Sequence, residues 1–229
     1  AGTPVLTSDG YKNIENIKEG DSVLTKEGNY KTVTATMSKD ADKLYYVYLQ
    51  NKSEPIITTA EHPFFVYDWS VGNGQGRWKL ACELTDRDFI AHRIINGTDT
   101  YDFDKLEINN NVLNSTDDFK YHFLVSWSVR SGISMMSSDS ISVQTKDKQT
   151  ALGLSQIIRD VYKKSTSISN IGDGFGGDLY VVSTYEHSSI QTDEFIYSKI
   201  RCIEVKDEQQ PVFNISVDES ETYTVYDGV

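Results

Sequence analysis

Two side chains near residue 60 have the types and the spacing to act on a peptide bond. Thr59 and His62 lie three residues apart in the segment 58–65, TTAEHPFF, directly after an apolar run. Histidine is the side chain that can deliver a proton to an amide nitrogen near neutral pH. A nearby hydroxyl can hold a strained amide or its tetrahedral oxyanion. A single histidine before a proline is more often structural, so this interpretation depends on the segments that accompany it.

Both ends of the chain carry further motifs. Residues 2–10, GTPVLTSDG, join a Gly-Thr pair to a short apolar run and a turn that ends in glycine. The segment 14–17, IENI, and the Gly-Asp pair at 20–21 follow. Near the other end, residues 212–217 read VFNISV and residues 221–229 read ETYTVYDGV. Together with the segment around His62, they form three separated blocks.

The order and spacing of these three blocks resemble the splicing blocks of the Hedgehog/intein (Hint) family. The resemblance covers residues 1–95 and 196–229 and implies a horseshoe-like β fold with the termini at its centre. It implies an intein that performs an acyl shift at its upstream junction, a transesterification and an asparagine cyclisation. Carried over to this chain, the resemblance gives Thr59 and His62 a role in the first step. It implies no cofactor and no metal, because the substrate is the protein's own backbone. The implied partners are the flanking extein sequences of a host protein, or a complementary intein fragment.

Four positions depart from the family pattern. Inteins begin with Cys or Ser, whose side chain attacks the preceding carbonyl, whereas Ala1 has no nucleophile. Asn214 stands where the family has Asp; it cannot shuttle a proton, although it can orient a water molecule or a backbone group. Glu221 occupies a histidine position, and the sequence ends at Val229 before the family's terminal His-Asn pair. We therefore expect an inactivated or truncated, precursor-like form, or a true start upstream of Ala1.

Two further residues are weaker candidates for the splicing site. Cys202 lies near the start of the late block, where some inteins use a thiol, but it also fits a buried strand cysteine. His92 lies on a predicted strand, where a core or surface histidine is the simpler interpretation. The scattered His, Cys and Asp residues form no cluster with the spacing of zinc ligands.

Residues 100–195 change character, and we predict a domain organisation of 1–99, 100–195 and 196–229. The inserted part reads helix, strand, helix, strand, with the helices at 119–129 and 148–164. The order slightly resembles half of a LAGLIDADG-type homing endonuclease. The first helix ends in residues 129–132, VRSG, and lacks the acidic metal ligand of that family. We therefore expect a degenerate remnant without nuclease activity.

The rest of the chain is dense in β-branched residues and turn signals, which predicts a mostly β fold with an α/β insertion. A charged turn is expected at 206–208, between two strands of the late block. The predicted strands lie at 3–7, 23–25, 30–37, 44–49, 56–59, 89–95, 140–145, 179–184, 196–205, 212–217 and 223–226.

Composition narrows the classes of function. The chain has 229 residues and a formal net charge of -12, so it repels phosphate backbones and nucleic acid is a disfavoured partner. Its two cysteines, far apart, indicate a reducing compartment, and we expect a cytoplasmic protein. No segment is apolar enough to span a membrane.

Three alternatives to an intein stay open at this level. A self-cleaving Hint domain would lack the groups for ligation. A homing endonuclease with a vestigial Hint part would cut DNA with a bound metal. A plain β-rich binding module would have no catalytic function.

Overall fold

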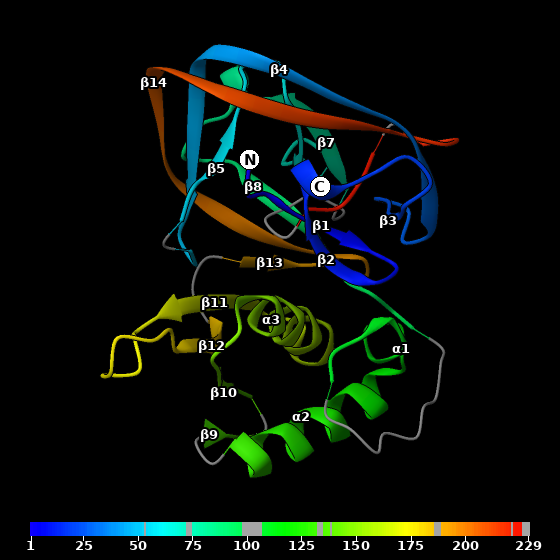
Figure 1. Cartoon of the computed structure of the whole chain (residues 1–229), viewed down its shortest axis with the longest axis vertical. Coiled ribbons are helices and arrows are strands. Elements are labelled where there is room, and N and C mark those ends of the chain that lie inside the picture. The colour runs from blue at the N-terminus through cyan, green and yellow to red at the C-terminus, as the bar shows by residue number, and fades with distance from the viewer. Residues whose placement is uncertain are drawn as a thin grey trace. The chain divides into compact units, whose positions relative to one another are not determined.

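The computed structural model describes residues 1–52, 54–71, 75–97, 107–131, 135–137, 139–185, 189–220 and 222–225. The chain forms two compact units, which are coloured in sequence order in Figure 1. The first unit comprises Ala1–Arg93 and Ser188–Val229, and the second comprises Ile94–His187. Within the described residues, strands outnumber helices, and every α-helix belongs to the second unit. The prediction of a mostly β chain is therefore confirmed.

The first unit is built from antiparallel strands joined by short turns. Its main sheet runs in the order β2-β1-β3-β4-β14-β8-β6-β7, while β5 pairs with β4 and β13 pairs with β14. Two short 3-10 helices, η1 (Ile14–Asn16) and η2 (Ala81–Glu83), connect strands. The strands are β1 (Pro4–Thr7), β2 (Gly10–Asn13), β3 (Ser22–Leu24), β4 (Tyr30–Leu49), β5 (Ile56–Thr58), β6 (Pro63–Tyr67), β7 (Gly76–Leu80), β8 (Phe89–Arg93), β13 (Ser189–Gln191) and β14 (Phe195–Val217).

Two long strands, β4 and β14, pair with each other along most of their length in the middle of the main sheet of the first unit (Figure 1). The predicted charged turn at 206–208 is wrong, because β14 continues through it. The segment lies within the long pairing of β14 with β4, and two of its charged side chains, Lys206 and Glu208, contact Tyr46 of β4. The Tyr46 hydroxyl donates to Glu208 at 2.7 Å, and Lys206 Nζ lies 4.0 Å from the centre of the Tyr46 ring.

The core of the first unit joins its two sequence segments. Val5 of β1, Ile14 and Ile17 around η1, and Val33 of β4 pack against Ile215 of β14. All five are at most 7% exposed. Because each fully buried aliphatic side chain contributes about 1.5–3 kcal/mol, this cluster fixes the start of the chain against the late block.

The second unit contains a four-stranded antiparallel sheet in the order β11-β12-β10-β9, together with helices. The predicted helices near 119–129 and 148–164 are present, and the second begins at the N-cap Asp147, whose carboxylate accepts from the Thr150 amide at 2.6 Å. It ends at Lys163, whose φ of 51° places it in the left-handed region. The elements are α1 (Asn110–Leu113), α2 (Asp117–Ser131), β9 (Met135–Met136), β10 (Ile141–Thr145), α3 (Lys148–Tyr162), β11 (Ser165–Asn170) and β12 (Tyr180–Tyr185).

A fully buried ion pair connects the two long helices of the second unit. Lys120 of α2 and Asp160 of α3 are both 0% exposed, and Lys120 Nζ lies 2.9 Å from the Asp160 Oδ2. The backbone of Ile95 satisfies both charges, since its carbonyl accepts from Lys120 at 2.7 Å and its amide donates to Asp160 at 2.9 Å. Burial raises the pKa of Asp160, and the charge of Lys120 opposes that rise. In the part of the chain that the structure describes, no helix has the length and apolar character to cross a membrane.

Candidate functional site

A pocket of about 490 Å³ in the first unit brings together residues from both of its sequence segments. Ala1, Thr59, His62 and Asn214, which are all predicted site residues, line this one pocket. They come from the start of the chain, the turn between β5 and β6, and β14. The structure therefore places the four principal candidates around a common space.

The segment from Thr59 to His62 is a tight turn held by backbone hydrogen bonds. The His62 amide donates to the Thr59 carbonyl at 3.3 Å, which closes the turn. Two amides at η2 then fix its outer side: Ala81 donates to the His62 carbonyl at 2.9 Å, and Cys82 donates to the Ala60 carbonyl at 3.1 Å. This backbone anchoring explains why a spacing of three residues sets Thr59 and His62 at one pocket.

The His62 imidazole is held in a largely desolvated position. Its ring meets the Phe64 ring edge-on, with centroids 5.1 Å apart and an interplanar angle of 80°. Burial lowers the pKa of His62 to about 4, and the neighbouring Glu61 carboxylate only partly offsets this effect. His62 is therefore neutral near pH 7 and can accept a proton. Once protonated, it is a strong acid that readily gives the proton to a departing amide nitrogen.

Glu61 forms an ion pair with Lys39, another residue that lines the pocket. Lys39 of β4 donates to its Oε1 at 2.7 Å, and this contact is the main cause that lowers the pKa of Glu61. A side-chain hydrogen bond with Thr59 lowers the pKa of Glu61 further. Glu61 therefore remains an anion beside His62 and links the Thr59 hydroxyl to β4.

The Asn214 side chain has a defined orientation. Its Oδ1 accepts from the Ile215 amide at 2.9 Å and from the Tyr223 hydroxyl at 3.0 Å. The Ile215 amide is a donor, so the oxygen and not the NH₂ group of Asn214 must face it. Asn214 can therefore serve the pocket through its N–H donors. Such donors suit the carbonyl oxygen of a peptide under attack.

The segment that carries Tyr223 is joined by backbone contacts to both β1 and β3. Thr224 donates its amide to Leu24 at 2.7 Å and accepts from the Leu6 amide at 3.1 Å. Val5 and Val225 form an antiparallel bridge. These backbone contacts set Tyr223 in the pocket wall, where burial raises its pKa to about 12, so it stays a protonated donor.

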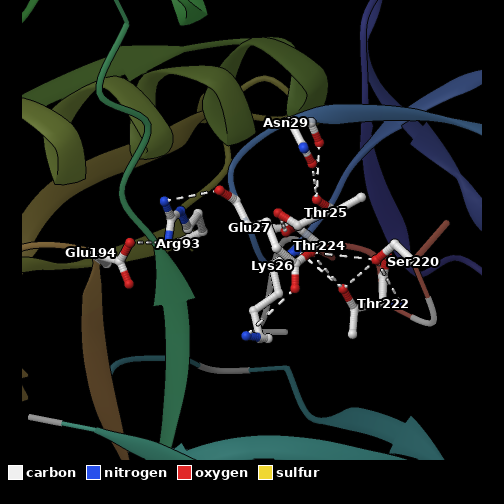
Figure 2. A network of polar contacts seen from close by, with 9 residues as sticks. All are labelled: Thr25, Lys26, Glu27, Asn29, Arg93, Glu194, Ser220, Thr222 and Thr224. Carbon is white, nitrogen blue, oxygen red and sulfur yellow. Dashed lines mark hydrogen bonds and ion pairs between the residues drawn. The ribbon is translucent and has the colours of Figure 1, made fainter.

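Polar side chains around Glu27 add hydrogen bonds between this segment and the turn after β3 (Figure 2). The Ser220 and Thr222 hydroxyls each donate to the Glu27 Oε2 at 3.4 Å, and the Lys26 amide donates to Thr222 Oγ1 at 3.3 Å. On its other side, the Glu27 carbonyl accepts from Arg93 Nη2 at 3.3 Å, as Figure 2 shows. The turn after β3 thus joins the late block to the end of β8.

Two of the weaker candidates, Cys202 and His92, are not among the described residues that line the pocket. Cys202 lies on β14 opposite Tyr48 of β4 and is partly buried. His92 lies on β8 opposite Ile196 and is 2% exposed. Glu221 lies outside the described residues. In the described ranges, no group of three or more His, Cys, Asp or Glu side chains is arranged to hold a metal ion.

Sequence reasoning did not single out Tyr223 or Glu61 as functional residues. Tyr223 stands inside the late block, but only the folded chain shows its hydroxyl on Asn214. Glu61 lies within the Thr-x-x-His spacing, and its partner Lys39 is 22 residues away. An aromatic residue two positions after the family's histidine position was the one available signal for Tyr223.

The desolvation of His62 makes the stability of the first unit depend on pH. The folded pKa of about 4 lies below the ordinary histidine value of 6.5. The stability that neutral His62 contributes is therefore complete above pH 6.5 and is lost as the pH falls through 4. Relative to His62→Gln, the parent chain should lose roughly 2–3 kcal/mol over that window. Urea denaturation at several pH values measures the difference. Parallel stability curves for the two proteins would contradict the desolvated position of His62.

Comparisons with known proteins identify the family of the chain. The family model described as the intein splicing domain matches residues 4–229. No curated protein sequence matches the chain. Among solved structures, the chain is similar to the solution structure of a bacterial intein-like domain from Clostridium thermocellum. That pair shares 20% identity with a TM-score of 0.40, over 98% of this chain and 89% of the other. Because the family model covers nearly all of the sequence, the chain belongs to the intein splicing domain family, and its function is protein splicing.

Proposed function

We propose that the pocket around His62 is where this intein acts on the peptide bond that precedes position 1. The observation that carries the proposal is that Ala1, Thr59, His62 and Asn214 line one pocket. The substrates are the flanking extein sequences of a host protein. A complementary intein fragment is a further partner, because the two sequence segments of the first unit hold each other through the β4–β14 pairing.

The first step needs a nucleophile at position 1. Its sulfur or oxygen would form a bond with the preceding carbonyl carbon while the carbon–nitrogen bond breaks. Neutral His62 would take the proton of the nucleophile and pass it to the departing nitrogen, so that the step is balanced. The N–H donors of Asn214 and the hydroxyl of Thr59 would stabilise the oxyanion that forms between these events.

Alanine at position 1 blocks this step, because a methyl group can neither lose a proton nor attack a carbonyl. We therefore propose that the chain with Ala1 performs no acyl shift through the side chain of residue 1. The low pKa of His62 and the orientation of Asn214 support the proposal that the rest of the site is able to act. A single change at position 1 should then restore upstream cleavage.

The test is a fusion of a reporter protein to the N-terminus of the full chain, with Ala1→Cys. Added dithiothreitol should release the reporter at the bond before position 1, because a thioester at that bond exchanges with free thiol. The matched control is the same fusion with Ala1, which should stay intact. Mass spectrometry of the products gives the cleaved bond. A folded Ala1→Cys fusion that resists thiol would overturn the proposal for this register.

For the second unit, we propose a degenerate remnant of a homing endonuclease without nuclease activity. The support is the helix–strand–helix order of α2, β10 and α3, together with the C-terminal end of α2. That end reads Val129-Arg130-Ser131 and offers no carboxylate as a metal ligand. A plasmid-cleavage assay with Mg²⁺ over a library of DNA sites would test the proposal, and a sequence-specific cut would overturn it.

A further inference from the structure

A carboxylate holds the backbone of residue 2, directly after the junction. The Gly2 amide donates to both oxygens of Glu15, at 3.0 Å to Oε1 and 2.8 Å to Oε2. Gly2 has a φ of 83°, a conformation that glycine adopts without steric cost. One residue further, the Thr3 carbonyl accepts from the Ile14 amide at 2.8 Å. The start of the chain is thus fixed at two consecutive residues.

The backbone that carries Glu15 is itself firmly anchored. Glu15 lies in η1 between Ile14 and Ile17, which are 7% and 4% exposed and pack in the core with Val5. The Glu15 side chain is exposed, so the core does not require its carboxylate. Its described hydrogen bonds are the two to Gly2. The exposed Glu15 carboxylate therefore accepts from one backbone amide, that of the peptide bond between residues 1 and 2.

We propose that Glu15 is a positioning residue for the upstream junction, an inference that rests on the proposed function. The amide that it holds belongs to the peptide group joining residues 1 and 2, so fixing this group also fixes the direction of residue 1. Ala1 lies in the pocket with His62. A charged acceptor makes the contact stronger than one between neutral groups. Because misplacement of a reacting group by a small distance slows reaction steeply, loss of the clamp should slow the acyl shift.

The activity test uses the reporter fusion with Ala1→Cys and follows the first-order rate of thiol-dependent release. Glu15→Ala should slow release roughly tenfold or more, and Glu15→Gln, which keeps one acceptor oxygen, should slow it less. The matched control is Glu19→Ala, which removes another exposed carboxylate four residues later. Thermal melting of each variant checks that the fold is intact. Equal rates for Glu15→Ala and its parent would overturn the inference.

A spectroscopic test examines the contact without any reaction. In ¹⁵N–¹H spectra of the chain with Ala1, Glu15→Ala should move the Gly2 amide proton upfield, because the amide loses its charged acceptor. The control Glu19→Ala should leave this resonance unchanged. An unchanged Gly2 resonance in Glu15→Ala would overturn the inference. If the Ala1→Cys parent itself resists thiol while Gly2 shifts in Glu15→Ala, the contact exists but the proposed function fails, and the role of Glu15 in the reaction fails with it.

Discussion

Replacement of His62 by Ala in the reporter fusion that carries Ala1→Cys is expected to slow thiol-dependent release roughly 100- to 10,000-fold. Without the His62 imidazole, the variant lacks the base that takes the thiol proton and the acid that gives it to the departing nitrogen. Burial holds the pKa of His62 near 4, so the parent works with a neutral base near pH 7. Single-turnover kinetics, followed by mass spectrometry, measure the ratio of the two rates.

The control for this prediction is His122→Ala in the same fusion. His122 lies on α2 in the second unit with a side chain that is 64% exposed, so its removal should leave the rate unchanged. Release at the parent rate from a folded His62→Ala fusion would show that the proton takes another route.

Lys120→Met is expected to destabilise the second unit by roughly 3–5 kcal/mol, because it leaves Asp160 as an uncompensated charge in a dry site. Both side chains are 0% exposed in the parent. Burial already raises the pKa of Asp160, so in the variant the carboxyl should be neutral at low pH. The loss of stability should therefore shrink on acidification and grow as the pH rises.

Urea unfolding monitored through Trp127 measures this loss within the second unit. Trp69 and Trp78 belong to the first unit, so replacing them by Phe isolates the signal of Trp127 on α2. The matched control is Lys146→Met, which removes an ion pair whose lysine side chain is 76% exposed. It should cost at most about 1 kcal/mol. Equal losses for the two variants would mean that the Lys120–Asp160 pair contributes no more than a surface pair.

The sequence pattern identified the class of fold and most elements, but it misjudged the long strands. Residues 30–37 and 44–49 were expected as separate strands, whereas β4 runs through both. The same error at 206–208 has the same origin: runs of charged residues usually mark turns. Here their partners lie on a neighbouring strand that is distant in sequence, as with Glu208 and Tyr46. Local propensity cannot register such cross-strand contacts.

Part of the site could be predicted from the sequence, because two of its residues lie in one short segment with a recognisable spacing. Thr59 and His62 share one tight turn, so their spacing, together with the accompanying blocks, indicated that they act together. Glu15 and Tyr223 could not be identified in this way. Each acts through a residue outside its own turn: Glu15 through the amide of Gly2, 13 residues away, and Tyr223 through Asn214, nine residues away. Only the folded backbone shows which carboxylate or hydroxyl faces the junction.

Because Phe195 pairs with Arg93, the second unit can be treated as one long loop of the chain that is closed by these two strands. These two residues are cross-strand neighbours at the ends of β14 and β8, so the chain leaves and re-enters the first unit at nearly one point. The entropy of closing a loop grows only with the logarithm of its length. Shortening the connection from roughly a hundred residues to about ten changes that cost by only about 2 kcal/mol. A whole folded domain can therefore be inserted, removed or replaced between these two strands with little change in the stability of the first unit.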